Sequence, residues 1–483
     1  MELEIVFLIE TFIVEVVVMS MGGVVFEDIE INVLSSIDRS YRRYICMLSD
    51  LVAVDTVSAV KGSSEMLEGA QLVSSMLSEV GFRTEVKSYG GHPMVVGELG
   101  DGPISILIYN HYDVQPPDPL ELWDSPPFQL VERDGKIFGR GVSDNKGDIV
   151  ARLAAIEALT PYLDRLGVKV KWIIEGEEEI GSPTLSKAVE DLKNWLKADG
   201  GFWETASVDR RGRLHILLGF KGMLYIEIML KGACRDVHSG YSPLVPNPVW
   251  CLSHILSSIK SCDGRILVDW LFNDVEIHPE ALELLKELDL DELNELKMML
   301  GIDRFNTGLE GFEALKTLYL SPSINVSGIY AGYIGKGSKT VIPSVAGVKI
   351  DIRLVPRQDP MKILEKLRQH IKSLGIDKFE IVLHGMYPAG STKPNEKIVQ
   401  ASINAAERVY GVKPQLLPLS AGSGPYYYIA NYIGTPLTGA GVGYYDSRAH
   451  APNENIRIED FVKGIKHVAL TITGFSKTMK SNK

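Results

Sequence analysis

Residues 104–113 have the sequence ISILIYNHYD, an apolar run that ends in a histidine and an aspartate. The apolar part, 104–109, has the length and composition of a buried strand. Apolar residues at helical spacing predict a helix over 148–159, and a second apolar run predicts a strand over 168–174. Strands and helices that alternate in this way predict an α/β fold.

The same patterns divide the rest of the chain. Further helices are expected over 183–196, 396–410 and 459–475. The middle predicts paired strands 214–218 and 223–230 around Lys221-Gly222, a Glu/Leu-rich amphipathic helix at 279–300, a strand at 348–354, a helix from Asp359-Pro360 and a strand at 379–383. We therefore expect an inserted α+β domain over 214–387, between two parts of the α/β domain, 26–213 and 388–483.

Charge and cysteine content exclude several classes of protein. The 483 residues include 50 Lys and Arg against 62 Asp and Glu, a formal net charge of −12, so the basic surface that nucleic acids require is lacking. The four cysteines form no C-x-x-C pair. They predict free, mostly buried thiols in a reducing compartment, and hence a cytoplasmic protein.

The N-terminal segment 1–25 needs separate treatment. Residues 5–18 are apolar but contain Glu10 and Glu15, and acidic residues stand where a secretory signal would be basic. The run is also too short and too charged for a membrane span. We expect no membrane partner, and we expect either that 1–25 lies outside the working fold or that translation starts at Met19 or Met21.

Potential metal ligands follow the predicted strands. His111 and Asp113 come directly after the 104–109 strand, where α/β sheets place their sites. Residues i and i+2 of an extended chain point the same way, so Asp113 can fix the tautomer of a metal-bound His111. Taken alone, this motif is better explained by a surface histidine, because His-x-Asp often occurs by chance.

A glycine-rich segment supplies a possible bridging ligand. Residues 139–147 read GRGVSDNKG, so glycines flank Asp144 ahead of a predicted helix. A carboxylate there can bridge two metal ions about 3.5–4 Å apart. The alternative is an ordinary helix N-cap.

Acidic residues gather behind the next strand. Residues 175–182 read EGEEEIGS, and four carboxylates at a strand end repel one another unless cations or solvent neutralise them. Glu178 and Glu179 can therefore serve as base and ligand. A solvated acidic loop is the alternative.

Two further candidates complete the set. Glu204 ends another short apolar run, with Asp199 as its rival, and His450 lies in the segment SRAHAPNE at 447–454. Each is unremarkable alone. Together with the other segments they offer two histidines and several carboxylates, a set that suits zinc, manganese or cobalt rather than copper or calcium.

The order and local sequence of these segments resemble the co-catalytic metallopeptidases. That family includes carnosinase-like dipeptidases, glutamate carboxypeptidases, acetylornithine deacetylase and succinyl-diaminopimelate desuccinylase. The resemblance covers about 28–476, and the stretch HYDVQP at 111–116 with DPLELW at 118–123 is most similar to the dipeptidase branch. It implies a di-metal catalytic domain with the insert as lid and dimerisation domain.

The resemblance also implies roles for the matched residues. Two divalent ions per chain, zinc most of all, would be held by His111 and Glu204, by Glu179 and His450, and by Asp144 as the bridge between them. Glu178 would be the general base that activates a bridging hydroxide, and Asp113 would orient His111. His238 would act across a homodimer interface to stabilise the oxyanion, and Arg353 would bind the substrate carboxylate.

Substrate-binding positions depart from the family pattern. Ser242 and Pro243 replace two usual glycines after the His238 segment. The run LSAGSGP at 419–425 lacks a usual arginine, which leaves Gly422 and Ser423 as candidate contacts. His384 is either a further substrate contact or a structural histidine.

The expected function is metal-dependent cleavage of the amide bond in dipeptides or small peptides. An N-acyl amino acid deacylase shares every implied metal ligand and is the main alternative. A non-catalytic binding module of the same fold is a distant one, because such a protein should have lost ligands or the base.

Overall fold

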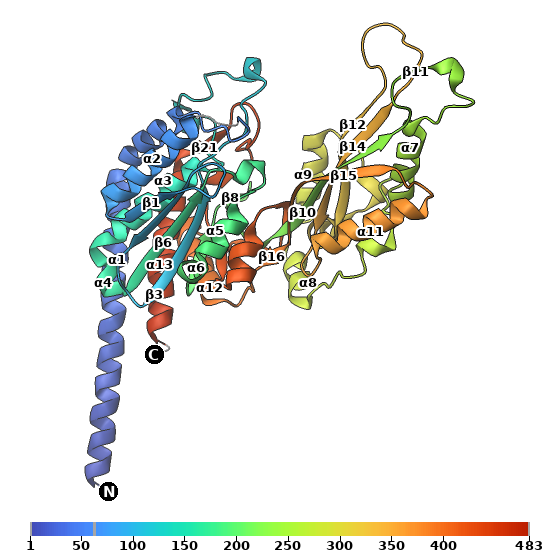
Figure 1. The fold of residues 1–483 in the computed structure, drawn as a ribbon. Coiled ribbons are helices and arrows are strands. Elements are labelled where there is room, and N and C mark those ends of the chain that lie inside the picture. Colours follow the sequence, from blue (N-terminus) through green and yellow to red (C-terminus); the bar gives the residue numbers. More distant parts are fainter. Residues whose placement is uncertain (1, 61–63, 482–483) are drawn as a thin grey trace. The chain divides into compact units, whose positions relative to one another are not determined.

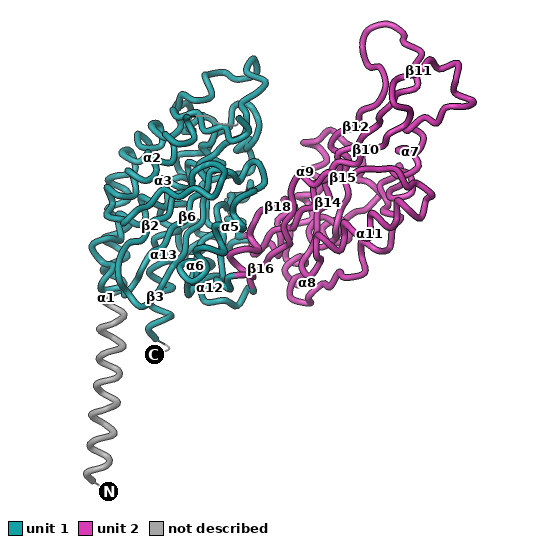
Figure 2. The backbone as a smooth tube through the Cα atoms, viewed as in Figure 1, with its two compact units in different colours: residues 1–216, 393–415, 433–483 teal, residues 217–392, 416–432 magenta. Residues whose placement is uncertain are grey.

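The structure is a computed structural model that describes residues 2–60 and 64–481, with side chains from residue 26 onward. The chain forms two compact units, which are coloured separately in Figure 2. Unit 1 comprises 1–216, 393–415 and 433–483, and unit 2 comprises 217–392 and 416–432.

Unit 1 is an α/β unit whose elements are labelled in Figure 1. Its helices are α1 (Glu2–Ala53), α2 (Ser64–Val80), α3 (Lys146–Leu159), α4 (Leu163–Leu166), α5 (Leu185–Asp191), α6 (Lys193–Leu196), α12 (Lys397–Tyr410) and α13 (Ile458–Ser481). Its strands are β1 (Arg83–Lys87), β2 (Met94–Leu99), β3 (Ile104–His111), β4 (Val131–Arg133), β5 (Lys136–Phe138), β6 (Val168–Glu175), β7 (Gly200–Trp203), β8 (Ser207–Val208), β9 (Leu214–Leu217), β19 (Leu437–Gly439), β20 (Gly443–Tyr444) and β21 (Asn455–Arg457).

The main sheet of unit 1 has six strands in the order β1-β2-β6-β3-β7-β19. Strands β6, β3, β7 and β19 run parallel to one another, so their carboxyl ends meet at one edge. Helices α1, α3, α12 and α13 pack against one another, and α3 also contacts β3. The central strand β3 is buried over almost its whole length, as its apolar sequence predicts. The expected α/β class is confirmed.

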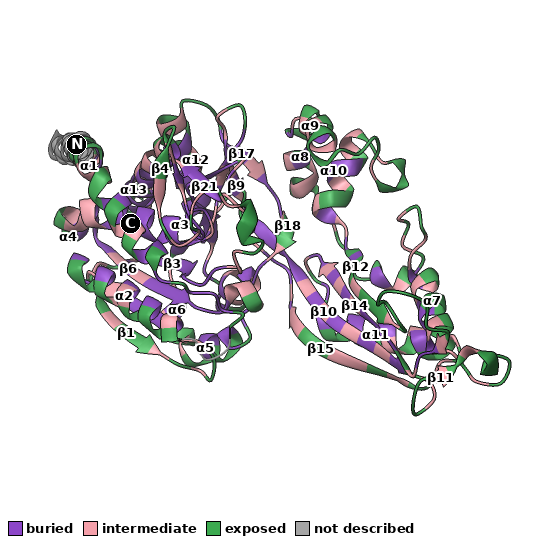
Figure 3. Ribbon diagram, turned by 90° about the horizontal axis from the view of Figure 1, so that it is seen from above, coloured by how far each residue is buried: buried purple, intermediate pink, exposed green. Residues whose placement is uncertain are grey.

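Unit 2 is built on an antiparallel sheet with the order β12-β14-β10-β15. Its strands are β10 (Gly219–Lys231), β11 (Val237–His238), β12 (Ser323–Ala331), β13 (Val341–Ile342), β14 (Val345–Leu354), β15 (Phe379–Tyr387), β16 (Gly390–Ser391), β17 (Gln415–Leu417, which begins in unit 1) and β18 (Ser420–Ser423), and its helices are α7 (Pro248–Ile259), α8 (Pro279–Lys286), α9 (Asp291–Leu300), α10 (Gly311–Leu320) and α11 (Pro360–Ser373). The first four residues of β10 are buried, and over 222–230 buried and half-buried residues alternate (Figure 3). The buried face packs on α7 and α11 in one apolar core.

Two local expectations for the middle of the chain are wrong. Strands 214–218 and 223–230 do not pair, because β10 pairs with β14 and β15 while β9 pairs with β8. Gly222 lies inside β10, where a Cβ atom would come within 2.5 Å of the Ala389 nitrogen, so this glycine marks a close backbone approach rather than a turn.

The expected helix at 279–300 is two helices, α8 and α9. The Asp289 side chain accepts a hydrogen bond from the Asp291 nitrogen at 2.9 Å and starts the second helix. Leu285 on α8 and Leu293 on α9 are buried, so one face of each helix packs into an apolar core.

The cysteines and one domain boundary also differ from expectation. All four cysteines are free, as expected, but all four are exposed rather than buried: Cys46, Cys234, Cys251 and Cys262. They lie on helix surfaces and in loops. Segment 416–432 joins unit 2, since β18 pairs with β10.

The N-terminal segment begins helix α1, whose side chains before residue 26 lie outside the described part of the chain. Within the described residues, no helix combines the length and hydropathy needed to cross a bilayer.

His467 on α13 predicts a pH dependence of stability. Burial lowers its pKa from 6.5 to about 4, so the ring stays neutral in the folded chain. The unfolded chain binds the proton more tightly, so stability present above pH 6.5 is lost as the pH falls toward 4. Between pH 7.5 and 5 the loss from this residue is about 2 kcal/mol. Urea unfolding should show this extra loss in the natural chain relative to a His467→Asn variant. Equal losses in both would contradict it.

Candidate metal centre and active site

The parallel strands of unit 1 bring the candidate ligands to one edge of the sheet. His111 ends β3, Glu178 and Glu179 follow β6, and Glu204 follows β7. Because β3 lies between β6 and β7 in register, these chain ends meet in space. The loop that carries His450 follows β19 and β20.

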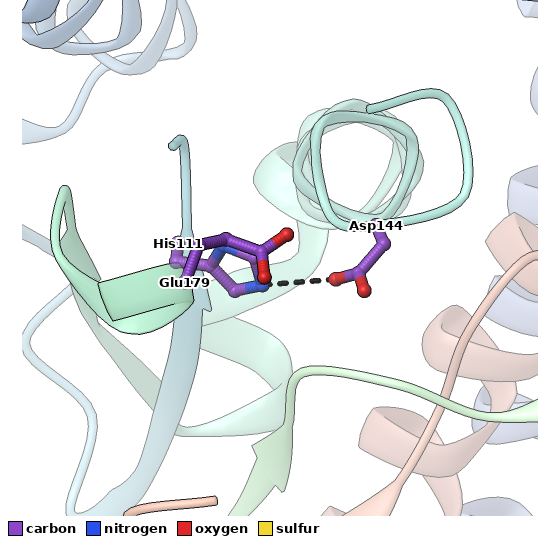
Figure 4. Close-up of side chains that lie close together, drawn as sticks. All are labelled: His111, Asp144 and Glu179. Atoms are coloured by element: carbon purple, nitrogen blue, oxygen red, sulfur yellow. Dashed lines mark hydrogen bonds and ion pairs between the residues drawn. The ribbon is translucent and has the colours of Figure 1, made fainter. Parts of the chain in front are cut away.

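Asp144 lies between the two histidines. Its Oδ1 is 3.0 Å from Nε2 of His111, and its Oδ2 is 3.0 Å from Nε2 of His450. Figure 4 shows Asp144 facing His111 and Glu179 from the opposite side of the site. One carboxylate thus presents a separate oxygen to each imidazole, which is the arrangement expected of a bridging ligand. The peptide bond from Asp144 to Asn145 is cis.

Glu179 lies beside His450, and Glu204 lies beside His111. Glu179 Oε2 is 3.2 Å from Nε2 of His450, and Glu204 Oε2 is 3.8 Å from Nε2 of His111. Oε1 of Glu179 and Oε2 of Glu204 are buried without a hydrogen-bond partner. Asp199, the alternative to Glu204, lies at the other end of β7, where its Oδ2 accepts hydrogen bonds from Ser105.

Asp113 connects the two segments that follow β3 and β6. Its Oδ1 is 3.3 Å from Nδ1 of His111, and its two oxygens accept hydrogen bonds from the nitrogens of Glu178 and Glu179 at 3.3 and 3.0 Å. This completely buried carboxylate therefore orients a histidine and fixes the acidic turn. Gln115, which the sequence analysis missed, donates to Glu179 Oε2 at 2.9 Å and leaves Oε1 free to bind a cation.

Burial disfavours negative charge throughout the acidic cluster. It raises the pKa of Glu204 to about 8 and, together with the nearby charge of Glu204, raises the pKa of Glu178 well above its usual range. Burial and then the charge of Asp144 also raise the pKa of Glu179.

The same surroundings favour positive charge on the two histidines. Hydrogen bonds to Asp144 and Glu179 raise the pKa of His450 to about 10. Burial lowers the pKa of His111, but hydrogen bonds to Asp113 and Asp144 outweigh it and the pKa rises well above 6.5. Protons here balance charge that a cation would otherwise balance.

These features fit divalent cations. Nitrogen and carboxylate oxygen atoms converge, and one oxygen of Glu179 and one of Glu204 are buried without a hydrogen-bond partner. His111, Asp144 and Glu179 lie close enough together to share one ion. The ligand set suits zinc, manganese or cobalt.

A second layer of buried residues, which the sequence analysis missed, holds the strand ends together. Arg152 on α3 donates to the carbonyl oxygens of Tyr109, Trp203 and Ala440, which lie at the ends of β3, β7 and β19. Asp148, one turn earlier on α3, accepts from Asn145 and from the Val442 nitrogen. The sequence did contain a signal, because an acid and a base four residues apart interrupt the otherwise apolar stretch 147–156 of this helix.

The other candidate residues belong to unit 2. His238 is exposed on β11, and its Nδ1 accepts a hydrogen bond from the Gly240 nitrogen. Arg353 lies on β14 with Nε 3.4 Å from Asp351.

His384, Gly422 and Ser423 have local partners within unit 2. His384 on β15 pairs with Glu227 at 3.0 Å. Gly422 and Ser423 lie on β18, where Ser423 donates to the Gly222 carbonyl oxygen. These contacts explain their placement without assigning a substrate.

Comparison with known proteins settles the family. Residues 107–474 match the family described as Peptidase family M20/M25/M40. The chain belongs to this family. It is therefore a metallopeptidase, a hydrolase of peptide bonds, and the resemblance inferred from its motifs is confirmed.

Individual relatives of this M20/M25/M40 peptidase cover nearly its whole length. It is 29% identical over 466 residues to the Cys-Gly metallodipeptidase dug1 of Schizosaccharomyces pombe, which covers 89% of this chain and 95% of that protein. It is 26% identical to the Beta-Ala-His dipeptidase of Homo sapiens, over 90% of each. Among solved structures, an M20 family metallo-carboxypeptidase, Sso-CP2 from Sulfolobus solfataricus, has a TM-score of 0.85 at 39% identity and covers 90% of this chain and 99% of its own.

The position of Asp144 between the two histidines predicts how metal binding responds to substitution. In Asp144→Asn, a neutral amide replaces the carboxylate. The ion beside His111 and the ion beside His450 would then both lose the anionic ligand that they share. Metal content after dialysis, measured by elemental analysis, should fall well below one ion per chain. Glu204→Gln alters only one side and should retain about one ion. Equal metal contents in the two variants would show that Asp144 is not a bridge.

Proposed function

We propose that the chain hydrolyses dipeptides and small peptides at a centre of two divalent cations, with Glu178 as general base. The observation that carries this proposal is the Asp144 carboxylate between two histidines, each with a second carboxylate beside it. Zinc is the preferred ion on ligand chemistry, with manganese and cobalt as alternatives.

The reaction then follows from the chain's own groups. Bound cations would supply Lewis acidity toward the scissile carbonyl and lower the pKa of an attacking water. Glu178 accepts the proton of that water and later donates a proton to the leaving amine, because burial gives its carboxyl a raised pKa. Asp113 keeps the Glu178 backbone nitrogen in place during both transfers.

A peptide with a free carboxyl terminus is the proposed substrate class. The relatives named as dipeptidases and the one named as a carboxypeptidase both release a C-terminal residue. The partly exposed guanidinium of Arg353 suits such a carboxylate. His384, Gly422 and Ser423 are proposed as further substrate contacts.

A substrate panel tests this proposal. Purified, metal-stripped chain would receive zinc, manganese or cobalt singly and then dipeptides, C-terminally amidated dipeptides and N-acyl amino acids. We expect metal-restored cleavage of free dipeptides and much weaker cleavage of the amidated ones. Cleavage of N-acyl amino acids alone would make the chain a deacylase. If a chain with two bound ions cleaves none of these substrates, the result would indicate a non-catalytic binding module.

Glu178→Gln should reduce kcat by about 10²–10⁴-fold, because the amide cannot accept the proton from water. Glutamine has nearly the same shape as glutamate, so elemental analysis of the variant should show the natural metal content. Substantial residual turnover, or a loss of metal that accounts for the lost activity, would contradict the assignment.

We also propose that unit 2 is a lid and dimerisation domain and that the working enzyme is a homodimer. The exposure of His238 supports this, because an oxyanion donor must reach a substrate. The four exposed free cysteines support a reducing, cytoplasmic location.

Mixed subunits test the role of His238. Glu178→Ala and His238→Ala chains, each inactive alone, would be unfolded together and refolded as mixed dimers. If His238 acts on the partner's site, random pairing restores about a quarter of the natural rate, since half of the dimers contain one complete site. An active His238→Ala chain would show that His238 has no role, and no recovery in mixed dimers of two inactive variants would show that it acts within its own chain.

A further inference from the structure

Glu454 is a buried carboxylate with an unusual number of donors. It lies four residues after His450 and is completely buried. Its Oε1 accepts hydrogen bonds from the nitrogens of Ser143 and Asp144 at 2.9 and 3.0 Å. Its Oε2 accepts from the Gly141 nitrogen at 2.9 Å and from the Arg140 Nη1 at 2.7 Å. One side chain therefore holds the whole turn that presents Asp144.

Arg140 extends these contacts to a third segment. Its guanidinium is 1% exposed, and Nη2 donates to the Pro116 carbonyl oxygen at 3.3 Å. The same guanidinium lies 5.3 Å from the ring centre of Trp123. Pro116 directly follows Gln115, which holds Glu179, so the ion pair connects the segments that carry all the histidine and bridging ligands.

We propose that the buried Arg140–Glu454 ion pair is the positioning device of the metal centre. It fixes the distance between Asp144 and His450, because Glu454 belongs to the His450 loop and binds the Asp144 turn. The inference rests on the proposed di-metal centre. Both side chains are buried, so we assign both as positioning residues.

The chemistry of the pair explains why its charge is needed. Four N–H groups point at two oxygens, and a carboxylate accepts all of them. In Glu454→Gln, the amide nitrogen would face donors, so at least one backbone nitrogen and the turn around it must move. Removal of Arg140 instead leaves a buried carboxylate without its cation.

The experiment measures metal affinity and fold separately. Zinc affinity would be measured by chelator competition, and the visible spectrum of the cobalt-loaded chain would report ligand geometry. The chains would be the natural one, Glu454→Gln, Arg140→Met and the double variant. Asp460→Asn is the matched control, because Asp460 is also a buried carboxylate in an ion pair, but its partner is Arg457, three residues away in the chain.

We expect Glu454→Gln to weaken zinc binding by about 10–100-fold and to change the cobalt spectrum, as loss of an outer-shell partner does. The double variant should bind no more weakly than the worse single variant, since the two residues act as one device. Asp460→Asn should keep the natural zinc affinity, although it should lose about as much thermal stability as Glu454→Gln does. If Glu454→Gln does not fold, Arg140→Lys keeps the charge but offers a single ammonium to two acceptors, and it should weaken zinc binding in the same direction.

Two results would overturn the inference, and they are distinguishable. Natural zinc affinity in Glu454→Gln, or in Arg140→Lys if only that variant folds, would exclude the positioning role while leaving the proposed function intact. A natural chain that binds no zinc, manganese or cobalt would overturn the proposed function and this inference together.

Discussion

The contact between Asp144 and the two histidines is the constraint on which unit 1 depends. Its two oxygens each lie 3.0 Å from an imidazole nitrogen, although His111 and His450 are far apart in the sequence. To hold that geometry, a parallel sheet aligns three strand ends, and a buried carboxylate at Asp113 ties the acidic turn to His111. The fold is thus arranged around one small group of atoms.

Such an arrangement concentrates charge in the protein interior, where charge is costly. The chain offsets this cost with buried cations that donate to backbone carbonyl groups. Arg152 binds carbonyl oxygens at the ends of β3, β7 and β19. Lys146, completely buried beside the Asp144 turn, donates to the carbonyl oxygens of Leu51 and Val54, where α1 ends. Burial lowers the pKa of this lysine to about 7.

The sequence predicted the features that depend on local patterns. The 104–109 run became the centre of the sheet, and the ligand segments were found because each follows a strand. Asp113 beside His111 is a relation of i to i+2, which an extended chain makes almost automatically. Contacts between distant segments were not predictable: Glu454 and Arg140 lie 314 residues apart, and no local pattern relates them. The wrong prediction of a strand pair around Gly222 has the same cause. The backbone that approaches Gly222 closely, at Ala389, is remote from it in the sequence.

The order of the candidate ligand segments along the chain has a consequence for biosynthesis. The segments that carry His111, Asp144, Glu179 and Glu204 are made before the His450 loop, but they cannot form the complete candidate centre by themselves. Strand β19, the His450 loop and α13 are made only after the segments that form unit 2. Domains fold largely in the order in which they are made. The nascent chain therefore carries an incomplete candidate centre until the segments of unit 2 and then the His450 loop have been synthesised.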